Sequence, residues 1–398
     1  MRERRNYLLI LGAIAALLVG AVLLAVPGSP LYKKPTLGLD LQGGLEVVLR
    51  AVPQKGQSID PQQMQIAQQV ITQRTNASGL VSPNIAIQGG NEIVIQLAGV
   101  HDPAKAARTI GSTGQLQMFD FETSLLPPTL SASQQPAPLP SLYGLLKAVQ
   151  TKANKGSPQA YYLFKTVKKK ITTKVKGKKV TKTKTFHQLV QGEPPWGAPT
   201  LKQLLLPYKD GVQPPDTQVL KVPANTEPVS CKIASASCLG AGTNGRSKSG
   251  EYWYLFKLPP ALTGKDLVES GITADSDPNS GSPIVTLQFT GHGSHEFKRI
   301  TEDEYNRGRV NAGQAGQLNA QDQNTIATYA GHNAIVLDGR LDETPYIDYT
   351  DSILSQGIVG NAEITEPSAQ TARRTALVLQ SGSLPYSFRQ VWRASCPR

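Results

Sequence analysis

Apolar positions over residues 37–122 follow two different periods, and these periods predict a regular order of elements. Alternate apolar positions predict strands, whereas apolar residues three and four apart after Asp60-Pro61 predict a helix. A Gly89-Gly90-Asn91 turn joins two of the strands into a hairpin. The expected elements are a strand at 45–49, a helix at 60–79, strands at 85–87 and 93–97, a helix at 102–110 and a strand at 116–121. This order is that of the split βαβ, or ferredoxin-like, arrangement.

Residues 262–388 return to the same alternation of strands and helices. The expected elements are a strand at 284–289, a helix from about Ser294 through Tyr305, a mobile loop at 307–325, a strand at 334–337 closed by an Asp338-Gly339 turn, a strand at 362–364, a helix ending near Gln380 and a strand at 384–388. Together, 37–122 and 262–388 predict one α+β, ferredoxin-like base built from both ends of the chain. Residues 389–398 are expected to form an irregular tail.

Residues 123–261 are rich in Pro, Gly and Ser and predict an inserted, β-rich head entered through a Pro-rich linker. Within it, ten lysines and no acid lie from Lys165 to Lys184, so the net charge of +12 leaves only 12 − 10 = +2 elsewhere. Interleaved Thr and Val favour strands, so this run is expected to be a solvated β-hairpin or a disordered loop. The alternative is contact with anionic lipid headgroups or an acidic partner. Nucleic acid is not expected, because the run lacks interleaved aromatic residues that stack bases.

The amino terminus carries the composition of a membrane anchor. Three arginines in residues 1–6 precede 7–26, twenty residues without a charge, and about 20 apolar residues suffice to cross a bilayer. This predicts a cytoplasmic tail at 1–6, a transmembrane anchor at 7–26 and an extracytoplasmic remainder, single-pass in the cell membrane. A signal peptide cleaved near residues 25–28 is the alternative.

Few residues of the sequence are candidates for a disulfide, a metal site or a catalytic site. Cys231 and Cys238 lie seven positions apart in a small-residue loop, which fits either a disulfide in an oxidising compartment or two free thiols. His292 and His295 have a spacing that places two imidazoles near one ion, but no third ligand stands nearby, and a glycine-rich turn before a helix explains the segment more simply. No catalytic residue, metal or cofactor is expected.

Four stretches carry a resemblance to a known family. Gly38-Leu39-Asp40-Leu41-Gln42-Gly43-Gly44, directly after the expected anchor, resembles the signature of SecD, a subunit of the bacterial protein-export machinery. Three others agree with the family in order: Leu262-Thr263-Gly264, Ala334-Ile335-Val336-Leu337-Asp338-Gly339 and Ser381-Gly382-Ser383-Leu384-Pro385. These motif residues are read as structural, with Gly43 and Gly44 shaping the first strand.

The resemblance implies an accessory subunit of the Sec translocase that assists preprotein release. Its head and base would act with SecF, the SecYEG channel and the translocating preprotein, coupled to the proton motive force in the complete complex. The family continues past the Leu384-Pro385 segment into further membrane helices that relay protons, whereas this chain stops at Arg398. By itself it is therefore not expected to conduct protons. The alternatives are a signal-anchored extracytoplasmic binding protein, a metal-dependent enzyme using His292 and His295, or an inactive truncated relic.

Overall fold

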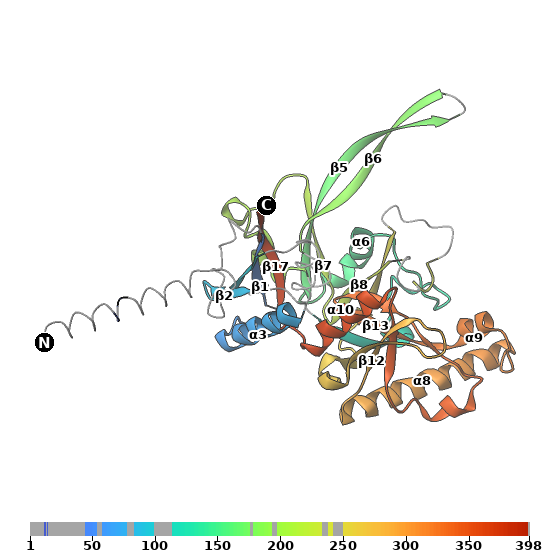
Figure 1. Cartoon of the computed structure of the whole chain (residues 1–398). Helices are drawn as coiled ribbons and strands as arrows, with labels where there is room; N and C mark the ends of the chain where they lie inside the picture. Colours follow the sequence, from blue (N-terminus) through green and yellow to red (C-terminus); the bar gives the residue numbers. More distant parts are fainter. Residues whose placement is uncertain are drawn as a thin grey trace, which may run out of the picture.

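The described part of the protein is a β-rich α+β structure in which four sheets pack with several helices (Figure 1). The computed structural model describes residues 44–53, 58–77, 83–98, 114–175, 178–192, 197–232, 238–241 and 250–396, together with Gly12 and Ile14. The helices are α3 (Pro61–Ala77), α5 (Phe121–Ser124), α6 (Leu142–Ala153), α7 (Leu201–Leu205), α8 (Gly291–Ala315), α9 (Gln323–Tyr329) and α10 (Ala369–Gln380). The strands are β1 (Gly44–Val52), β2 (Asn84–Gln88), β3 (Glu92–Ala98), β4 (Leu116–Asp120), β5 (Ala160–Val175), β6 (Lys178–Gln191), β7 (Thr217–Val222), β8 (Thr226–Lys232), β9 (Glu251–Lys257), β10 (Leu262–Thr263), β11 (Thr273–Ser276), β12 (Pro283–Leu287), β13 (Gly331–Leu337), β14 (Arg340–Glu343), β15 (Tyr346–Ile347), β16 (Ala362–Thr365) and β17 (Ser387–Cys396).

Both ends of the described chain meet in one antiparallel sheet with the strand order β17-β1-β3-β2. The predicted strand, helix and hairpin of 45–97 are present, and α3 packs on this sheet through a core that includes Met64, Ile71 and Ile95. The predicted helix at 102–110 lies outside the described residues. The prediction that residues 389–398 are irregular is wrong as far as Cys396, because β17 pairs with β1 along its length.

The strand predicted at 116–121 forms as β4 but does not join that sheet. It pairs instead with β10 and β13 in a seven-stranded sheet of order β10-β4-β13-β14-β8-β9, with β15 beside β13. The reason is its burial on both faces: Leu116 and Met118 enter one hydrophobic core, whereas Phe119 enters another. Such a strand requires cover on both sides. In the four-stranded sheet its place beside β1 is taken by β17.

Helix α8 extends through much of the range predicted as a mobile loop, 307–325. It continues to Ala315, where Gly316 adopts a left-handed conformation with φ of 69° and ends the helix, and α9 begins at Gln323. A Cβ on Gly308 would lie 3.1 Å from the Cβ of Tyr349, so a glycine inside the helix permits close packing. The loop prediction is therefore wrong over most of its length.

The lysine run forms the predicted β-hairpin, β5 and β6, which projects from the body of the molecule (Figure 1). At its base, β7 adds a third strand, and α6 covers the sheet through a core containing Leu145, Tyr162 and Leu220. No helix among the described residues is long and apolar enough to cross a membrane. The predicted anchor at 7–26 lies outside the described residues apart from Gly12 and Ile14.

Candidate functional site: a cavity between the sheets

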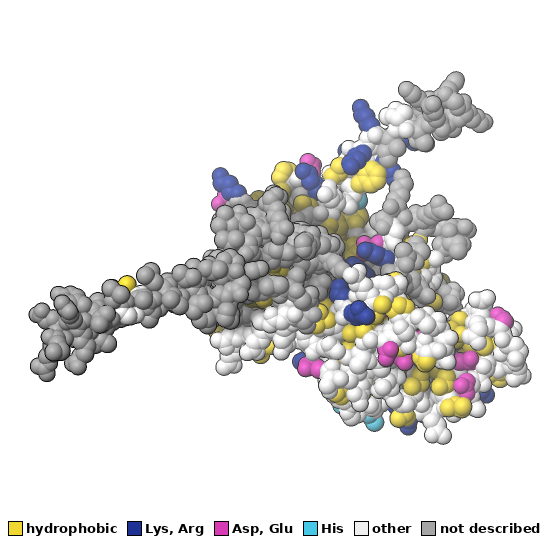
Figure 2. All heavy atoms as spheres, in the orientation of Figure 1, with side chains coloured by type: hydrophobic (Ala, Val, Ile, Leu, Met, Phe, Trp, Pro, Cys, Tyr) yellow, Lys and Arg dark blue, Asp and Glu magenta, His cyan; other side chains and the backbone are white. Residues whose placement is uncertain are grey.

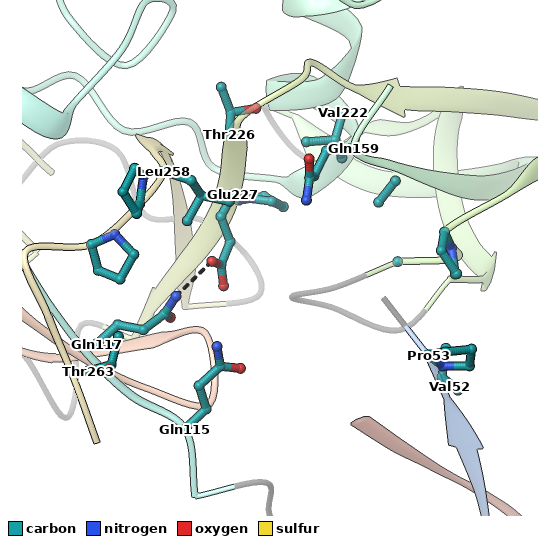
Figure 3. A pocket seen from close by; sticks show the side chains of 16 residues that line it. Val52, Pro53, Gln115, Gln117, Gln159, Val222, Thr226, Glu227, Leu258 and Thr263 are labelled. Atoms are coloured by element: carbon teal, nitrogen blue, oxygen red, sulfur yellow. Dashed lines mark hydrogen bonds between the residues drawn. The ribbon is translucent and has the colours of Figure 1, made fainter. Parts of the chain in front are cut away.

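A cavity of about 270 Å³ lies where the seven-stranded sheet, the base of the β5–β7 sheet and the end of β1 come together (Figure 3). Its wall is largely apolar and rich in proline: Val52, Pro53, Ala160, Pro199, Val222, Pro228, Leu258, Pro259 and Pro260. Polar residues line it from β4 and the residue before it, from β8, and from the residue before β5: Gln115, Gln117, Gln159, Thr226 and Glu227. An apolar wall with a few polar groups is the usual composition of a binding site.

Glu227 and Gln117 form the polar centre of this cavity. The Gln117 amide donates from Nε2 to Glu227 Oε2 at 3.0 Å, and the two residues are 2% and 7% exposed, respectively (Figure 3). Burial raises the pKa of the Glu227 carboxyl to about 7, although the Gln117 hydrogen bond acts in the opposite direction. The same carboxyl contributes, after burial, to raising the pKa of Tyr162.

Two oxygens in this pair are buried acceptors without a hydrogen bond from any described group, Glu227 Oε1 and Gln117 Oε1. A buried acceptor without a donor costs about 1–3 kcal/mol. The pair is therefore suited to accept hydrogen bonds from amide, hydroxyl or ammonium groups that enter the cavity.

A second cavity of about 230 Å³ adjoins the first and shares Val52, Pro53, Gly197 and Pro199 with it. It runs along the end of β1 toward Phe388 of β17 and is lined by Leu204 and by Leu206, which is 65% exposed. The two cavities thus follow one another across the junction between the four-stranded sheet and the β5–β7 sheet. Their succession fits an extended segment better than a compact small molecule.

Behind the cavity, buried Arg74 of α3 joins segments from both ends of the chain. Its Nε donates to Ser381 Oγ and its Nη2 to the Gly382 carbonyl, each at 2.8 Å, and the residue is 0% exposed. Burial lowers the pKa of Arg74 to about 10, while the charge of Asp338 opposes this effect. Asp338 in turn accepts from the Gln115 backbone N–H at 2.9 Å, which links this junction to the wall of the cavity.

Comparison with known families matches two separate parts of the chain. Residues 64–123, which contain Arg74, match the family described as protein translocase subunit SecDF, P1 domain, N-terminal, and residues 242–386 match SecDF, P1 head subdomain. The chain belongs to the SecD family. The head match overlaps 262–388, the range predicted as the second half of the base, and covers little of the predicted head at 123–261.

Curated relatives carry the same family name. A "Protein translocase subunit SecD" of Thermobaculum terrenum is 40% identical over 121 residues, covering 29% of this chain and 24% of the relative. The SecD of Acidaminococcus fermentans is 34% identical over 122 residues, covering 31% and 28%. The SecDF of Thermus thermophilus is 26% identical over 377 residues, covering 92% of this chain and 33% of the relative. The chain thus spans about a quarter of the first SecD relatives.

Among solved structures, a crystal structure of SecDF in a super-membrane-facing form aligns at 23% identity and a TM-score of 0.43, covering 98% of this chain and 35% of the other. A second structure, described as a membrane component SecDF that enhances protein export, aligns at 21% identity and a TM-score of 0.40, covering 87% of this chain and 98% of the other.

Several described residues of the SecD-like motifs lie in turns or in a hydrophobic core. Asp338 and Gly339 have φ angles of 51° and 68° and form the tight turn between β13 and β14, as predicted. Gly382, with φ of 77°, follows α10, and Leu384 packs in the core of the four-stranded sheet. Of the opening motif, only Gly44 is described, at the start of β1; residues 38–43 lie outside the described part.

The two histidines of α8 do not converge. His292 Nδ1 lies 2.9 Å from Asp266 Oδ1, and His295 Nδ1 lies 3.2 Å from Glu296 Oε1, with both imidazoles largely exposed. Within the described ranges, no three His, Cys, Asp or Glu side chains lie close enough together to hold a metal ion. By contrast, Cys231 and Cys238 are joined in a disulfide, with their Cα atoms 5.8 Å apart.

Sequence reasoning missed both Glu227 and Gln117. Glu227 stands among Pro, Val and Ser in a segment whose pattern gives no sign that the carboxyl is buried. The pattern indicates only that Arg74 lies in the helix predicted at 60–79. A signal was present, since it occupies the same helical stripe as Ala67, Val70 and Ile71, where a cation is buried only when it is bonded.

Proposed function

We propose that this chain is an accessory subunit of the Sec protein translocase. The observation that carries the proposal is the succession of the two SecDF P1 matches, at 64–123 and 242–386, in the order expected for that domain. Relatives named protein translocase subunit SecD support the same reading. SecF, the SecYEG channel and a translocating preprotein are its proposed partners in the cell membrane, with residues 7–26 as its anchor.

In this proposal the four-stranded sheet with α3 is a ferredoxin-like base. Two observations support this proposal. The elements β1, α3, β2 and β3 follow one another as in the split βαβ arrangement, and β17 adds a fourth strand to give the order β17-β1-β3-β2. The head includes residues from 242–386, in agreement with the range of the family match. Coupling to the proton motive force belongs to the complete complex.

The cavity containing Glu227 and Gln117 is the proposed contact for an emerging polypeptide. An unfolded chain presents backbone N–H groups as well as apolar side chains, and the cavity offers buried acceptors within an apolar wall. The adjoining cavity extends this surface along β1. Both belong to junctions between sheets, where a change in the relative position of the sheets would open or close them.

Site-specific photo-crosslinking tests this proposal. A benzophenone amino acid at Gln159, on the cavity wall, is expected to trap a secretory chain stalled during export. The matched control carries the same group at Asn319, an exposed position between α8 and α9. Absence of crosslinks from position 159, or equal yields at both positions, would contradict polypeptide binding in the cavity.

A further inference from the structure

The outer part of the β5–β6 hairpin stands without a third strand or an opposing charge. Strand β7 pairs with β5 only from Ala160 to Lys165, and beyond this point the two hairpin strands pair with each other up to Val175 and Lys178. A two-stranded hairpin alone is marginally stable in water. None of the described ion pairs of the chain includes a lysine of this hairpin.

The strand register separates the described side chains of this outer part into two different faces. Cross-strand partners share a face and successive pairs alternate, so Val167↔Phe186 and Lys169↔Lys184 lie on one face. Lys182, two positions from Lys184, lies on the same face. Figure 2 shows dark blue basic and yellow hydrophobic atoms together along the described part of the hairpin. We call Val167, Lys169, Lys182, Lys184 and Phe186 the mixed face.

The opposite face carries threonine, lysine and one histidine and no apolar side chain among its described outer positions, which are Thr166, Lys168, Lys170, Thr172, Thr181, Thr183, Thr185 and His187. A hydroxyl pair, Thr172 Oγ1 and Thr181 Oγ1 at 3.0 Å, bridges the strands there. The apolar residues are thus confined to one face, which solubility alone does not require.

On the mixed face, cations lie directly opposite one another and beside an aromatic ring. Lys169 and Lys184 are cross-strand partners, an arrangement that is destabilising for like charges. Lys184 Nζ lies 5.9 Å from the centre of the Phe186 ring. Both lysines are exposed, whereas Val167 and Phe186 are half-buried. A surface that supplies anions and also accepts apolar groups would relieve the repulsion and cover the aromatic ring.

We propose that the mixed face docks the hairpin onto an anionic lipid bilayer. Anionic headgroups attract lysines near the surface, and apolar side chains on the same face enter the boundary with the acyl chains. A soluble acidic polypeptide supplies the charge but gives no reason for apolar residues on one face alone. This docking is separate from the proposed role in export and holds whether or not the cavity binds polypeptide.

The position of the hairpin agrees with this partner. Gly44 pairs with Cys396, so both ends of the described chain lie at one end of the β1–β17 pair. In Figure 1, β17 ends on the upper side of the molecule, from which the hairpin also rises. Residues 27–43 connect β1 to the apolar stretch 7–26, and at most about 3.5 Å per residue they hold β1 within roughly 60 Å of it. The free hairpin spans about 30 Å.

An environment-sensitive fluorophore on the hairpin tests this docking. The full chain is reconstituted into vesicles of phosphatidylcholine, with or without one third phosphatidylglycerol, in a Cys396→Ser background. Lys184→Cys carries the fluorophore on the mixed face, and Lys170→Cys, which removes the same charge, carries it on the opposite face. We expect the emission at position 184 to rise about twofold or more and to shift to the blue only with the anionic lipid, and the emission at 170 to change little.

A charge variant gives a second readout. With the fluorophore at 184, Lys169→Gln plus Lys182→Gln is expected to remove most of the lipid response, whereas Lys168→Gln plus Lys170→Gln on the opposite face leaves most of it. The proposal is overturned if position 184 gives no response to anionic vesicles, or if positions 170 and 184 respond equally. It is also overturned if soluble polyglutamate with phosphatidylcholine vesicles reproduces the response, since the partner is then an acidic polypeptide.

Discussion

Arg74 donates a hydrogen bond to the Gly382 carbonyl across 308 positions of sequence, and this bond connects α3 to the segment that leads from α10 into β17. Ser381 accepts a second bond from the same guanidinium. The two family-matched parts of the chain, 64–123 and 242–386, are therefore joined at one buried cation. Neighbouring Asp338, in the turn between β13 and β14, contributes charge to this junction.

Arg74→Met is expected to destabilise the protein by about 3 kcal/mol, because it removes a buried cation and leaves the half-buried Ser381 and Gly382 oxygens without their charged donor. The measurement is chemical denaturation of the full chain in detergent. Arg373→Met, on the exposed side of α10, is the matched control and is expected to change the free energy of unfolding by less than about 0.5 kcal/mol. Equal effects of the two substitutions would contradict a stabilising role for the hydrogen bonds that Arg74 donates to Ser381 and Gly382.

Gly293→Ala tests a close approach at the start of α8. A Cβ at this position overlaps the backbone carbonyl oxygen of Asp266, which accepts the N–H of Thr290 at 2.8 Å. We expect a loss of roughly 1–3 kcal/mol in the free energy of unfolding. Gly291→Ala, in the same helical turn, meets no atom within 4 Å and is expected to be neutral or slightly stabilising. A neutral Gly293→Ala contradicts the close packing of α8 on this loop.

Glu227→Gln should change how stability depends on pH. Since burial raises the pKa of Glu227 from 4.5 to about 7, the folded protein keeps a proton between these values that the unfolded chain has lost. The free energy of unfolding therefore falls as the pH rises from about 4.5 to 7, by an amount on the order of 3 kcal/mol for this group. Glu227→Gln should flatten this part of the curve in denaturation at stepwise pH. Parallel curves for parent and variant would contradict the buried carboxyl.

The disulfide between Cys231 and Cys238 is expected to stabilise the seven-stranded sheet. Closing so short a loop lowers the conformational entropy of the unfolded chain and thereby raises its free energy by about 2.5 kcal/mol. Cys231 is fully buried near the end of β8. Cys231→Ser with Cys238→Ser should lower the free energy of unfolding by about that amount, and added dithiothreitol should then have no further effect. If dithiothreitol leaves the parent unchanged, the disulfide contributes no stability.

The local pattern predicted elements well where each element depends on its own residues. The lysine run with its interleaved Thr and Val forms the β5–β6 hairpin, and the Asp338-Gly339 pair forms the turn between β13 and β14. Helix α3 and the β2–β3 hairpin likewise follow from Asp60-Pro61 and Gly89-Gly90-Asn91. Propensity and turn chemistry are sufficient in these segments, since both act within a few residues.

Features that depend on residues far apart in the sequence could not be predicted from the local pattern. Strand β4 reads as the fourth strand of the first sheet, yet its burial on both faces is visible only when β10 and β13 are placed beside it. Gly308 resembles a loop residue until Tyr349 is seen packed against it. The cavity pair Gln117–Glu227 joins residues 110 positions apart, and no spacing rule brings them together.

The central claim is that this chain assists protein export, and pulse-chase labelling of a secretory precursor tests it most directly. The organism that encodes the chain is compared with and without the gene, and with the gene restored. The account predicts slower conversion of precursor to mature protein when the gene is absent, and recovery when it is restored. Equal conversion rates in all three strains would contradict a role in the Sec translocase.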